Sequence, residues 1–380
     1  MLSATRIHPN PAEATVTVVS DTKDITDWAL RYFGGWWNAT AADAPTTSGG
    51  SIAKGGALLL ADVDSDRLSG VETLVGDYEH DEVDYANART LVARHEDGVV
   101  YAVQPAERLA YHYDPATSRF VIVGAQTEPV AVAASRIARE LIRGQLLRAG
   151  FHILHASCVV RDGHALLTFG PKGAGKTTTA LLLAREGYEL LANDRVFIHA
   201  EDEGLRILPW PSAAAIGFGL LESTGLYEPL RARVLDGEQM HPTQDQRVTD
   251  ALHAGSTKPI WNAMGKELKP QLFPAQLSSI LGMTLATEAR ATALLFPCVE
   301  EDTEPRLIPA PRALEEEDFF TSKTEDRYPD IFRLAPDKAG PATDLADRLA
   351  LLPRRSLVLT HDSRASAELL TKTAEGLLSE

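Results

Sequence analysis

The segment 170–177, with the sequence GPKGAGKT, constrains this 380-residue chain more than any other feature. It fits the pattern G-x-x-x-x-G-K-[ST], the phosphate-binding loop also called the P-loop or Walker A motif. Its glycines let successive backbone N–H groups point into one concavity, and a following helix adds its positive N-terminal end. An apolar strand is predicted directly before the loop, at 165–169, and a helix directly after it, at 176–186. This context predicts a true phosphate loop rather than a chance glycine-rich turn.

The positions of the loop have distinct expected roles in nucleotide binding. Lys176 can reach the outer phosphates as a point charge, and the Thr177 hydroxyl is placed to ligate Mg²⁺. Lys172 is expected either to be solvated or to reach a phosphate. The predicted nucleotide-binding residues are Gly170, Pro171, Lys172, Gly173, Ala174, Gly175, Lys176, Thr177 and Thr178.

The strand that leads into the loop belongs to a predicted β-hairpin. Apolar runs at 155–161 and 165–169 flank the pair Asp162-Gly163, which suits a tight two-residue turn because both positions can take positive φ. A hairpin strand before the loop differs from the parallel-sheet arrangement usual in GTPases and small nucleotide kinases. The chain also carries no Asn-Lys-x-Asp sequence for guanine recognition. These features argue against a GTPase.

Composition restricts the partners of the chain. With 37 Lys and Arg against 53 Asp and Glu, the formal charge is −16, which disfavours non-specific binding to nucleic acid or to an anionic membrane surface. No apolar run approaches the ~18 residues of a membrane span, and the first residues show no secretory signal. The sequence therefore predicts a cytoplasmic protein with neither nucleic acid nor membrane as a partner. Cys158 and Cys298 lie in apolar runs and are expected to be buried thiols.

Two domains are expected, because a chain of this length exceeds the roughly 150 residues of one domain. Residues 1–125 read as a β-rich N-terminal domain with a possible role in substrate recognition, and 130–380 as the catalytic domain. An amphipathic helix is predicted at 131–149, and Trp36-Trp37 are expected in a core or an interface. The predicted N-terminal strands cover 14–19, 57–63, 90–93, 99–103 and 120–123.

Three further segments of the catalytic region carry expectations. The segment 228–275 has six Lys and Arg residues and few apolar runs, which suits a lid, a substrate segment or a solvated loop. The acidic stretches 300–304 and 315–318 are expected to be solvated. Two helices, at 344–352 and 363–378, are expected to close the domain.

The segment 154–198, LHASCVVRDGHALLTFGPKGAGKTTTALLLAREGYELLANDRVFI, resembles the catalytic core of HPr kinase/phosphorylase and related bacterial kinases. That family pairs a histidine-led strand and hairpin with a phosphate loop, a helix ending in Gly, and a strand ending in acidic residues. The spacing agrees from His155 through Gly170 and Gly187 to Asp194, and a looser likeness extends over 130–335. The resemblance implies an α/β fold: a mixed-sheet P-loop kinase core of the HPr kinase and phosphoenolpyruvate carboxykinase type.

The resemblance also implies three catalytic residues, His155, Lys176 and Asp194. His155 matches the family's histidine near the phosphoryl group, and Asp194 matches one of two adjacent acidic residues linked to metal binding and proton transfer. Thr177 and Asp194 are therefore the expected metal ligands. Taken alone, His155 inside an apolar strand would ordinarily be a core histidine, and the alternative for Asp194 at a strand end is a turn residue.

Two positions depart from the family pattern. Asn193 stands where the second acidic residue is expected, and an amide cannot accept a proton as a carboxylate can. Thr178 replaces an acidic residue that is common in HPr kinases. Residues 1–125 show no kinship with the N-terminal domain of that family, so HPr itself is not the expected substrate.

These observations predict an ATP- and Mg²⁺-dependent kinase, a transferase that moves the γ-phosphoryl group to a serine-type hydroxyl. The acceptor would be a peptide, a protein or a small metabolite, in a biosynthetic pathway. Asp194 would take the hydroxyl proton, and a Lys or Arg from 228–275 would stabilise the transferred charge. The alternative is a nucleotide-binding regulatory module in which ATP orders a lid without phosphoryl transfer. The oligomeric state is left open, a homo-oligomer included.

Overall fold

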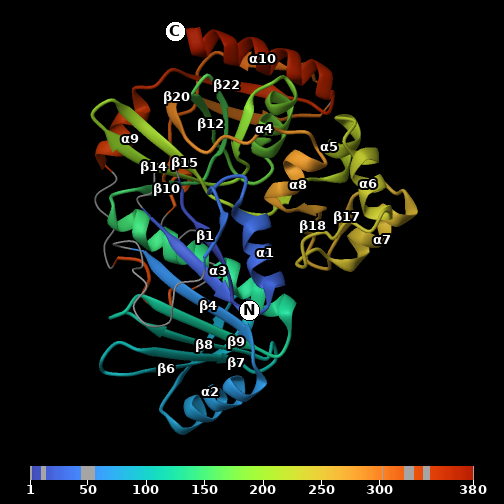
Figure 1. Ribbon diagram of the computed structural model, residues 1–380. Helices are drawn as coiled ribbons and strands as arrows, with labels where there is room; N and C mark the ends of the chain where they lie inside the picture. The colour runs from blue at the N-terminus through green and yellow to red at the C-terminus, as the bar shows by residue number, and fades with distance from the viewer. Residues whose placement is uncertain are drawn as a thin grey trace. The chain divides into compact units, whose positions relative to one another are not determined.

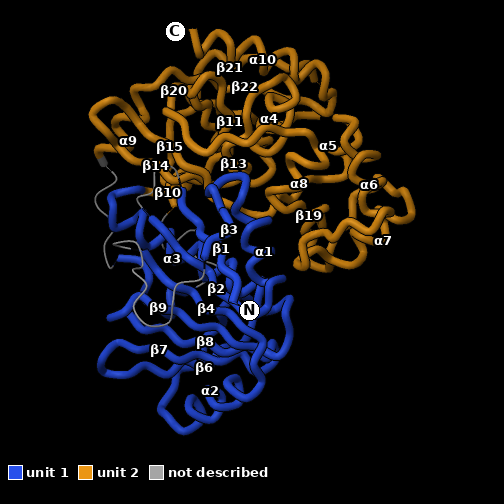
Figure 2. Tube along the Cα trace, viewed as in Figure 1, with its two compact units in different colours: residues 1–151, 321–340 blue, residues 152–320, 341–380 orange. Residues whose placement is uncertain are grey.

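The structure is a computed structural model that describes residues 2–9, 14–43, 56–301, 303–320, 329–336 and 343–379. The chain forms two compact units, shown in Figure 2: unit 1 is 1–151 with 321–340, and unit 2 is 152–320 with 341–380. Each unit contains a mixed β-sheet accompanied by helices (Figure 1). The predicted α/β class with mixed sheets is confirmed. Among the described helices, none is long and apolar enough to cross a membrane.

Unit 1 is built on nine strands in the spatial order β3-β1-β2-β4-β9-β8-β7-β6-β5. The strand β4 lies parallel to both of its neighbours, while the other neighbouring pairs are antiparallel. All five strands expected from the sequence are present, and β1, β3, β5 and β8 lie where no strand was expected. The strands are β1 (Ser3–Ile7), β2 (Val16–Ser20), β3 (Thr40–Ala42), β4 (Ala57–Val63), β5 (Asp81–Tyr85), β6 (Ala88–Arg94), β7 (Val100–Gln104), β8 (Leu109–Asp114) and β9 (Arg119–Gly124).

The helices of unit 1 are α1 (Lys23–Phe33), α2 (Ser65–Asp77) and α3 (Thr127–Arg148). Val121 and Val123 of β9 share a core with α2, while Phe120 points to the other face because side chains alternate along a strand. On that other face lies α3, whose Arg136 guanidinium is 5.8 Å from the ring of Tyr85. Trp36 and Trp37 are fully buried, as expected of core residues.

The boundary between the units lies after Phe151 rather than near residue 125. The predicted helix at 131–149 is α3, and it packs against α1, β4 and β9 of unit 1. Its apolar stripe, including Ile137 and Leu141, is buried on that sheet, so the helix belongs to the N-terminal unit.

Unit 2 has a second mixed sheet in the order β10-β14-β15-β20-β12-β11-β13, with β22 on β20 and β21 on β22. The strand β20 is parallel to both β12 and β22. These strands are β10 (His152–Leu154), β11 (Ser157–Arg161), β12 (His164–Thr168), β13 (Glu189–Ala192), β14 (Val196–Glu201), β15 (Gly204–Pro209), β20 (Ala289–Val299), β21 (Arg306–Ile308) and β22 (Arg354–Leu359).

The predicted hairpin before the loop is confirmed as β11 and β12. Arg161 lies opposite His164, which leaves Asp162 and Gly163 as the turn, with φ values of 53° and 80°. The strand β11 is also antiparallel to β13 on its other side. The amino end of β11 and the carboxyl ends of β12 and β13 therefore meet at one edge of the sheet.

Helices cover the sheet of unit 2. After the loop, α4 (Lys176–Arg185) packs on β11, and α10 (Ser363–Ser379) packs on α4. The helix α9 (Thr343–Ala350) contributes Leu345 and Leu349 to the core that contains Phe169. The two predicted closing helices are thus present, and β22 lies between them.

The segment 228–275 is more ordered than a solvated loop. It contains α6 (Tyr227–Leu235) and α7 (Gln246–Ala254), and it lies between α5 (Phe218–Ser223) and α8 (Pro274–Ser279). Short ladders accompany them: β16 (Ala214–Ala215) with β19 (Gln271–Leu272), and β17 (Ile260–Trp261) with β18 (Glu267–Leu268). The apolar residues are sparse yet spaced for one helix face, as with the buried pair Val248 and Leu252. The prediction of a solvated loop for 228–275, which was based on its few apolar residues, is therefore wrong.

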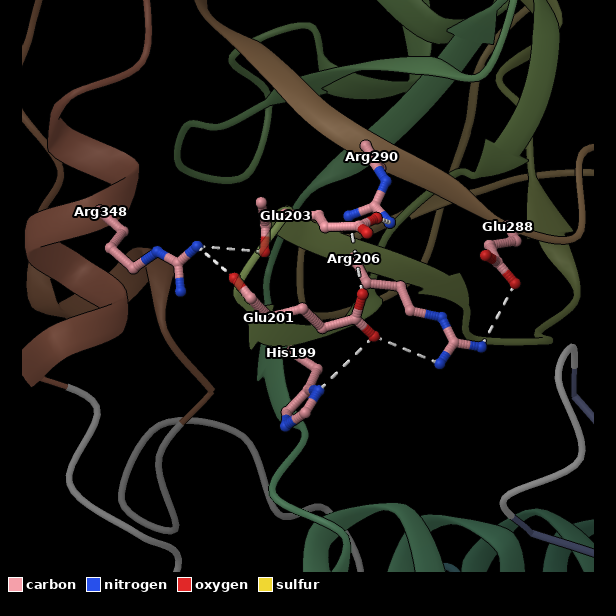
Figure 3. A network of polar contacts seen from close by, with 8 residues as sticks. His199, Glu201, Glu203, Arg206, Glu288, Arg290 and Arg348 are labelled. Atoms are coloured by element: carbon pink, nitrogen blue, oxygen red, sulfur yellow. Dashed lines mark hydrogen bonds and ion pairs between the residues drawn. The ribbon is translucent and has the colours of Figure 1, made fainter.

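Charged side chains form a network (Figure 3). It lies at the end of the sheet where β12 begins, since Arg290 lies opposite His164, whereas the phosphate loop follows the other end of β12. Arg206 of β15, whose side chain is only 7% exposed, pairs with Glu201 at 3.5 Å and with Glu288 at 3.3 Å. Arg290 at the start of β20 pairs with Glu201 at 3.6 Å, and Arg348 of α9 donates to the Glu201 carbonyl at 2.6 Å. These contacts join the hairpin β14-β15, β20 and α9. The candidate site lies at the other end of the strands, where the phosphate loop follows β12.

Candidate active site

The phosphate loop connects the end of β12 to the start of α4. Gly170, Gly173 and Gly175 have φ values of 147°, 90° and 102°, which favour glycine strongly. A Cβ atom on Gly170 would lie 2.7 Å from the Cβ of Ala174, and one on Gly175 would lie 3.1 Å from Cγ2 of Val299. The loop therefore has no room for side chains at these two glycines, and its tight curl is the backbone form that cradles a phosphate group.

Lys176 is the first residue of α4, and its ammonium group folds back over the loop. Its Nζ atom donates to the carbonyl of Gly170 at 2.5 Å and to that of Pro171 at 3.4 Å. The buried Ser157 hydroxyl donates to the Lys176 carbonyl at 2.9 Å, which fixes the start of the helix against β11. Lys172 is exposed on the loop. A phosphate in the loop would thus meet the helix N-terminus and the Lys176 charge together.

His155 and Asp194 are brought together beside the loop. His155 lies between β10 and β11, Asp194 lies just after β13, and the antiparallel pairing of β11 with β13 sets these two ends side by side. The Nε2 atom of His155 is 3.2 Å from Oδ1 of Asp194. His155 is therefore not a core histidine facing away from the loop, since its side chain is 25% exposed and turned toward a carboxylate.

The charges around Asp194 determine whether its carboxyl group is protonated. Burial raises the pKa of Asp194, but the hydrogen bond from His155 and the positive charges of Arg195, His155 and Lys176 outweigh burial and lower the pKa below its ordinary value. The Nε atom of Arg195 lies 3.5 Å from the second carboxylate oxygen. Asp194 is therefore ionised at neutral pH, so its carboxylate oxygens are available to a metal ion or to a proton.

Arg195 is a site residue that sequence reasoning missed. Its guanidinium lies 5.1 Å from the ring of Phe320 and 5.7 Å from that of Trp210. These aromatic faces hold the guanidinium beside Asp194. The adjacency of Arg195 to Asp194 was a usable signal in the sequence, whereas nothing there indicated Phe320.

The expectation that 315–318 is solvated is wrong for Asp318, whose residue exposure is 3%. Its two carboxylate oxygens accept hydrogen bonds from Nη1 and Nη2 of Arg312, each at 2.8 Å. Its carbonyl accepts the N–H of His155 at 2.9 Å, and the N–H of Phe320 donates to the Ile153 carbonyl at 3.0 Å. The ion pair with Arg312 makes burial of the Asp318 carboxylate possible. The two backbone hydrogen bonds hold the segment that carries His155.

The residues near the loop fit a magnesium ion better than a metal ion that is held by protein side chains alone. Within the part of the chain that the structure describes, no three His, Cys, Asp or Glu side chains gather to hold a metal. Mg²⁺ is usually bound by one or two carboxylates together with phosphates and water. The Asp194 carboxylate is a ligand of this kind, and the Thr177 hydroxyl at the start of α4 is the second ligand that the sequence predicts. Asn193 faces elsewhere, since its Oδ1 accepts a 3.4 Å hydrogen bond from Ser212.

Comparison with curated proteins finds HPr kinase/phosphorylases. One from Streptococcus thermophilus is 40% identical over 73 residues, which is 19% of this chain and 23% of that protein. One from Streptococcus equi subsp. zooepidemicus is 31% identical over 116 residues, covering 28% of this chain and 35% of that protein. The chain thus spans a quarter to a third of the length of these relatives. The resemblance to HPr kinases is confirmed for this part of the chain.

Two other comparisons complete these findings. Among solved structures, the Hpr(Ser) kinase/phosphatase from Coxiella burnetii matches with 14% identity and a TM-score of 0.21, over 42% of this chain and 66% of that chain. No protein-family model matches the chain.

Proposed function

We propose that this protein is a kinase that uses ATP and Mg²⁺ to phosphorylate a serine-type hydroxyl on a peptide, a protein or a small metabolite. The observation that carries the proposal is the meeting of the phosphate loop, with Lys176, and the His155–Asp194 pair at one edge of one sheet. The partial likeness to proteins named HPr kinase/phosphorylase supports the same chemistry.

The loop and its lysine would bind the phosphates. The backbone N–H groups of the loop and the N-terminal end of α4 face the anion, and the Lys176 ammonium exchanges its carbonyl contacts for phosphate oxygens. Thr177 and Asp194 would hold Mg²⁺, which when bound neutralises charge on the phosphates.

The His155–Asp194 pair would handle the proton of the acceptor. As the hydroxyl oxygen bonds to the γ-phosphorus, the bond from that phosphorus to the ADP oxygen breaks and the hydroxyl proton must leave. Asp194 is the proposed acceptor of that proton, and His155, 3.2 Å away, is positioned to share it. Arg195, paired with Asp194, would stabilise negative charge near the transferred group.

A nucleotide-binding regulatory module is the second candidate, and Asn193 favours it. The amide at this position contacts Ser212 and cannot serve as a second acidic group beside Asp194. Such a module would bind ATP and release neither ADP nor a phosphorylated product.

Product analysis separates the two candidates. The protein is incubated with γ-labelled ATP, Mg²⁺ and pools of serine-containing peptides, small proteins and hydroxylated metabolites. A kinase yields ADP and one labelled acceptor class, and Lys176→Ala removes both products. Tight ATP binding with no ADP and no labelled acceptor in any pool would rule out the kinase and leave the regulatory module.

A further inference from the structure

A short hairpin in unit 2 presents large apolar side chains to solvent. It is formed by β17 and β18, and Trp261 is 58% exposed while Met264 is 86% exposed. By contrast, Trp210 in the same unit is buried. Tryptophan and methionine are enriched in protein interfaces, so their joint exposure on one tip points to a partner.

The tip is an ordered turn. The Asn262 side-chain oxygen accepts the N–H groups of Met264 at 3.0 Å and of Lys266 at 2.8 Å. The Asn262 N–H donates to the Lys266 carbonyl at 2.9 Å, and Gly265 takes a φ of 71°. Because these bonds define the turn, the exposure of Met264 follows from a defined conformation.

The charge around the tip is positive. Three of the ten lysines of the chain lie within residues 258–269, although the chain carries a formal charge of −16. Lys258 and Lys266 are exposed, whereas Lys269 pairs with Glu267 at 3.1 Å. We define the hairpin patch as the exposed side chains of Trp261, Met264, Lys258 and Lys266. The patch suits a ligand that carries an apolar side chain next to carboxylates.

A short stretch of chain connects the base of the hairpin to the candidate active site. The carboxylate of Glu267 adjoins Gly217, where an added Cβ would be 3.1 Å from Oε1. Gly217 is five residues from Ser212, the partner of Asn193, and five residues can span at most about 18 Å. An extended segment of about eight residues can therefore reach from the hairpin base to Ser212, the partner of Asn193.

We propose that the hairpin patch docks the phosphoryl acceptor, and that this acceptor is a polypeptide with an apolar side chain flanked by Asp or Glu. The inference rests on the proposed kinase function and narrows its acceptor class to a polypeptide. The apolar side chain packs on Trp261 and Met264, while the carboxylates face Lys258 and Lys266. The serine then lies several residues along the segment, at the His155–Asp194 pair.

The test measures binding of defined peptides to the full-length protein by fluorescence anisotropy. The probe carries Asp-Leu-Glu-Leu-Asp seven residues from a single serine, and a matched peptide replaces its acidic residues with lysine. We expect the wild type to bind the acidic peptide at least 10-fold more tightly than the basic one. The double variant Trp261→Ala/Met264→Ala should lose that binding at least 10-fold, and Lys258→Glu/Lys266→Glu should reverse the preference.

Controls separate the patch from general surface effects. Leu351→Ala removes another highly exposed apolar side chain, 83% exposed, and Lys372→Glu reverses an exposed charge on α10; both should bind the acidic peptide as the wild type does. ATP affinity should be equal in all variants, which shows that each remains folded. Equal binding of both peptides by the wild type, or unchanged binding by the hairpin variants, would overturn the docking proposal.

Two further outcomes are informative. If the hairpin variants change the oligomeric state in light scattering and leave peptide binding unchanged, the patch is an interface between copies and the proposal is wrong. Peptide binding does not depend on turnover, so hairpin-dependent binding supports a polypeptide-binding surface by itself, whereas the absence of ADP and of any labelled acceptor in the product analysis contradicts the kinase function.

Discussion

The backbone N–H of His155 donates a 2.9 Å hydrogen bond to the carbonyl of Asp318, a residue far away in the sequence. These two residues lie next to the first two points at which the chain passes between its units, after Phe151 and after Phe320. The bond from the Phe320 N–H to the Ile153 carbonyl extends the same short ladder. The backbone that carries His155 is therefore held by the segment that leaves unit 2.

The Arg312–Asp318 pair should stabilise this ladder. Arg312→Met leaves the carboxylate of Asp318, whose side chain is 4% exposed, buried without its charge partner. We expect the free energy of unfolding to fall by about 3 kcal/mol, the lower end for breaking a buried ion pair, because Arg312 is itself 25% exposed. Urea titration measures the loss. The matched control is Arg306→Met, which breaks an exposed pair with Glu300 and should cost less than about 1 kcal/mol.

Lys176→Ala should weaken nucleotide binding and abolish turnover. The substitution removes the ammonium group that folds back over the carbonyls of Gly170 and Pro171. Lys172→Ala, an exposed lysine in the same loop, is the matched control and should retain most of the affinity. Calorimetry with ATP and Mg²⁺ makes the comparison, and equal affinities for Lys176→Ala and wild type would contradict the site.

Asp194→Asn tests the proposed base. The amide keeps the size of the side chain but cannot take a proton, so turnover should fall by roughly 10²–10⁴-fold, with a far smaller change in ATP affinity. Asn193→Asp restores the acidic pair of the resembled family and should retain activity. Steady-state kinetics with an identified acceptor provide the measurement. Near-normal turnover of Asp194→Asn would show that Asp194 is not the base, and His155 would be the next residue to test.

The Thr177 hydroxyl is the proposed partner of Asp194 in holding Mg²⁺. ATP should raise the melting temperature more in Mg²⁺ than in EDTA, because a ligand that binds the folded state stabilises it. Thr177→Val keeps the side-chain shape and should reduce the Mg²⁺-dependent part of the shift. Thermal scans of both proteins under both conditions test this, and identical shifts with and without the metal would remove Mg²⁺ from the proposal.

Cys158 should be inert in the folded protein. Burial raises the pKa of its thiol far above the ordinary value, so the reactive thiolate is scarce at neutral pH. Cys298 is half-buried, and burial together with Glu300 raises the pKa of its thiol as well. Iodoacetamide at pH 7.5 should modify Cys298 slowly and Cys158 only after unfolding in urea, as read by peptide mass spectrometry. Modification of Cys158 in the folded protein at the rate of Cys298 would contradict its burial.

Features that depend on neighbouring residues in the chain were predictable from the sequence alone. The turn at Asp162-Gly163, the loop glycines and the helix at 131–149 follow from local rules, because allowed φ values and apolar periodicity act over a few residues. His155 and Asp194 were each singled out through the matched family spacing, whereas their contact appears only in the structure, where the antiparallel register of β11 with β13 brings them together. Short helices such as α7 were not predicted from the sequence, because two buried residues give only a weak periodic pattern of apolar residues.

Contacts between distant segments were decided by the tertiary structure. Asp318 lies in an acidic stretch that reads as solvated, yet Arg312 compensates its charge and makes burial possible. Arg195 becomes part of the site because Trp210 and Phe320, from separate segments, bring their rings to its guanidinium. The boundary after Phe151 likewise depends on which sheet buries the apolar stripe of α3. Burial, ion pairing and packing depend on the partners that a residue meets in space, and local sequence patterns carry no information about those partners.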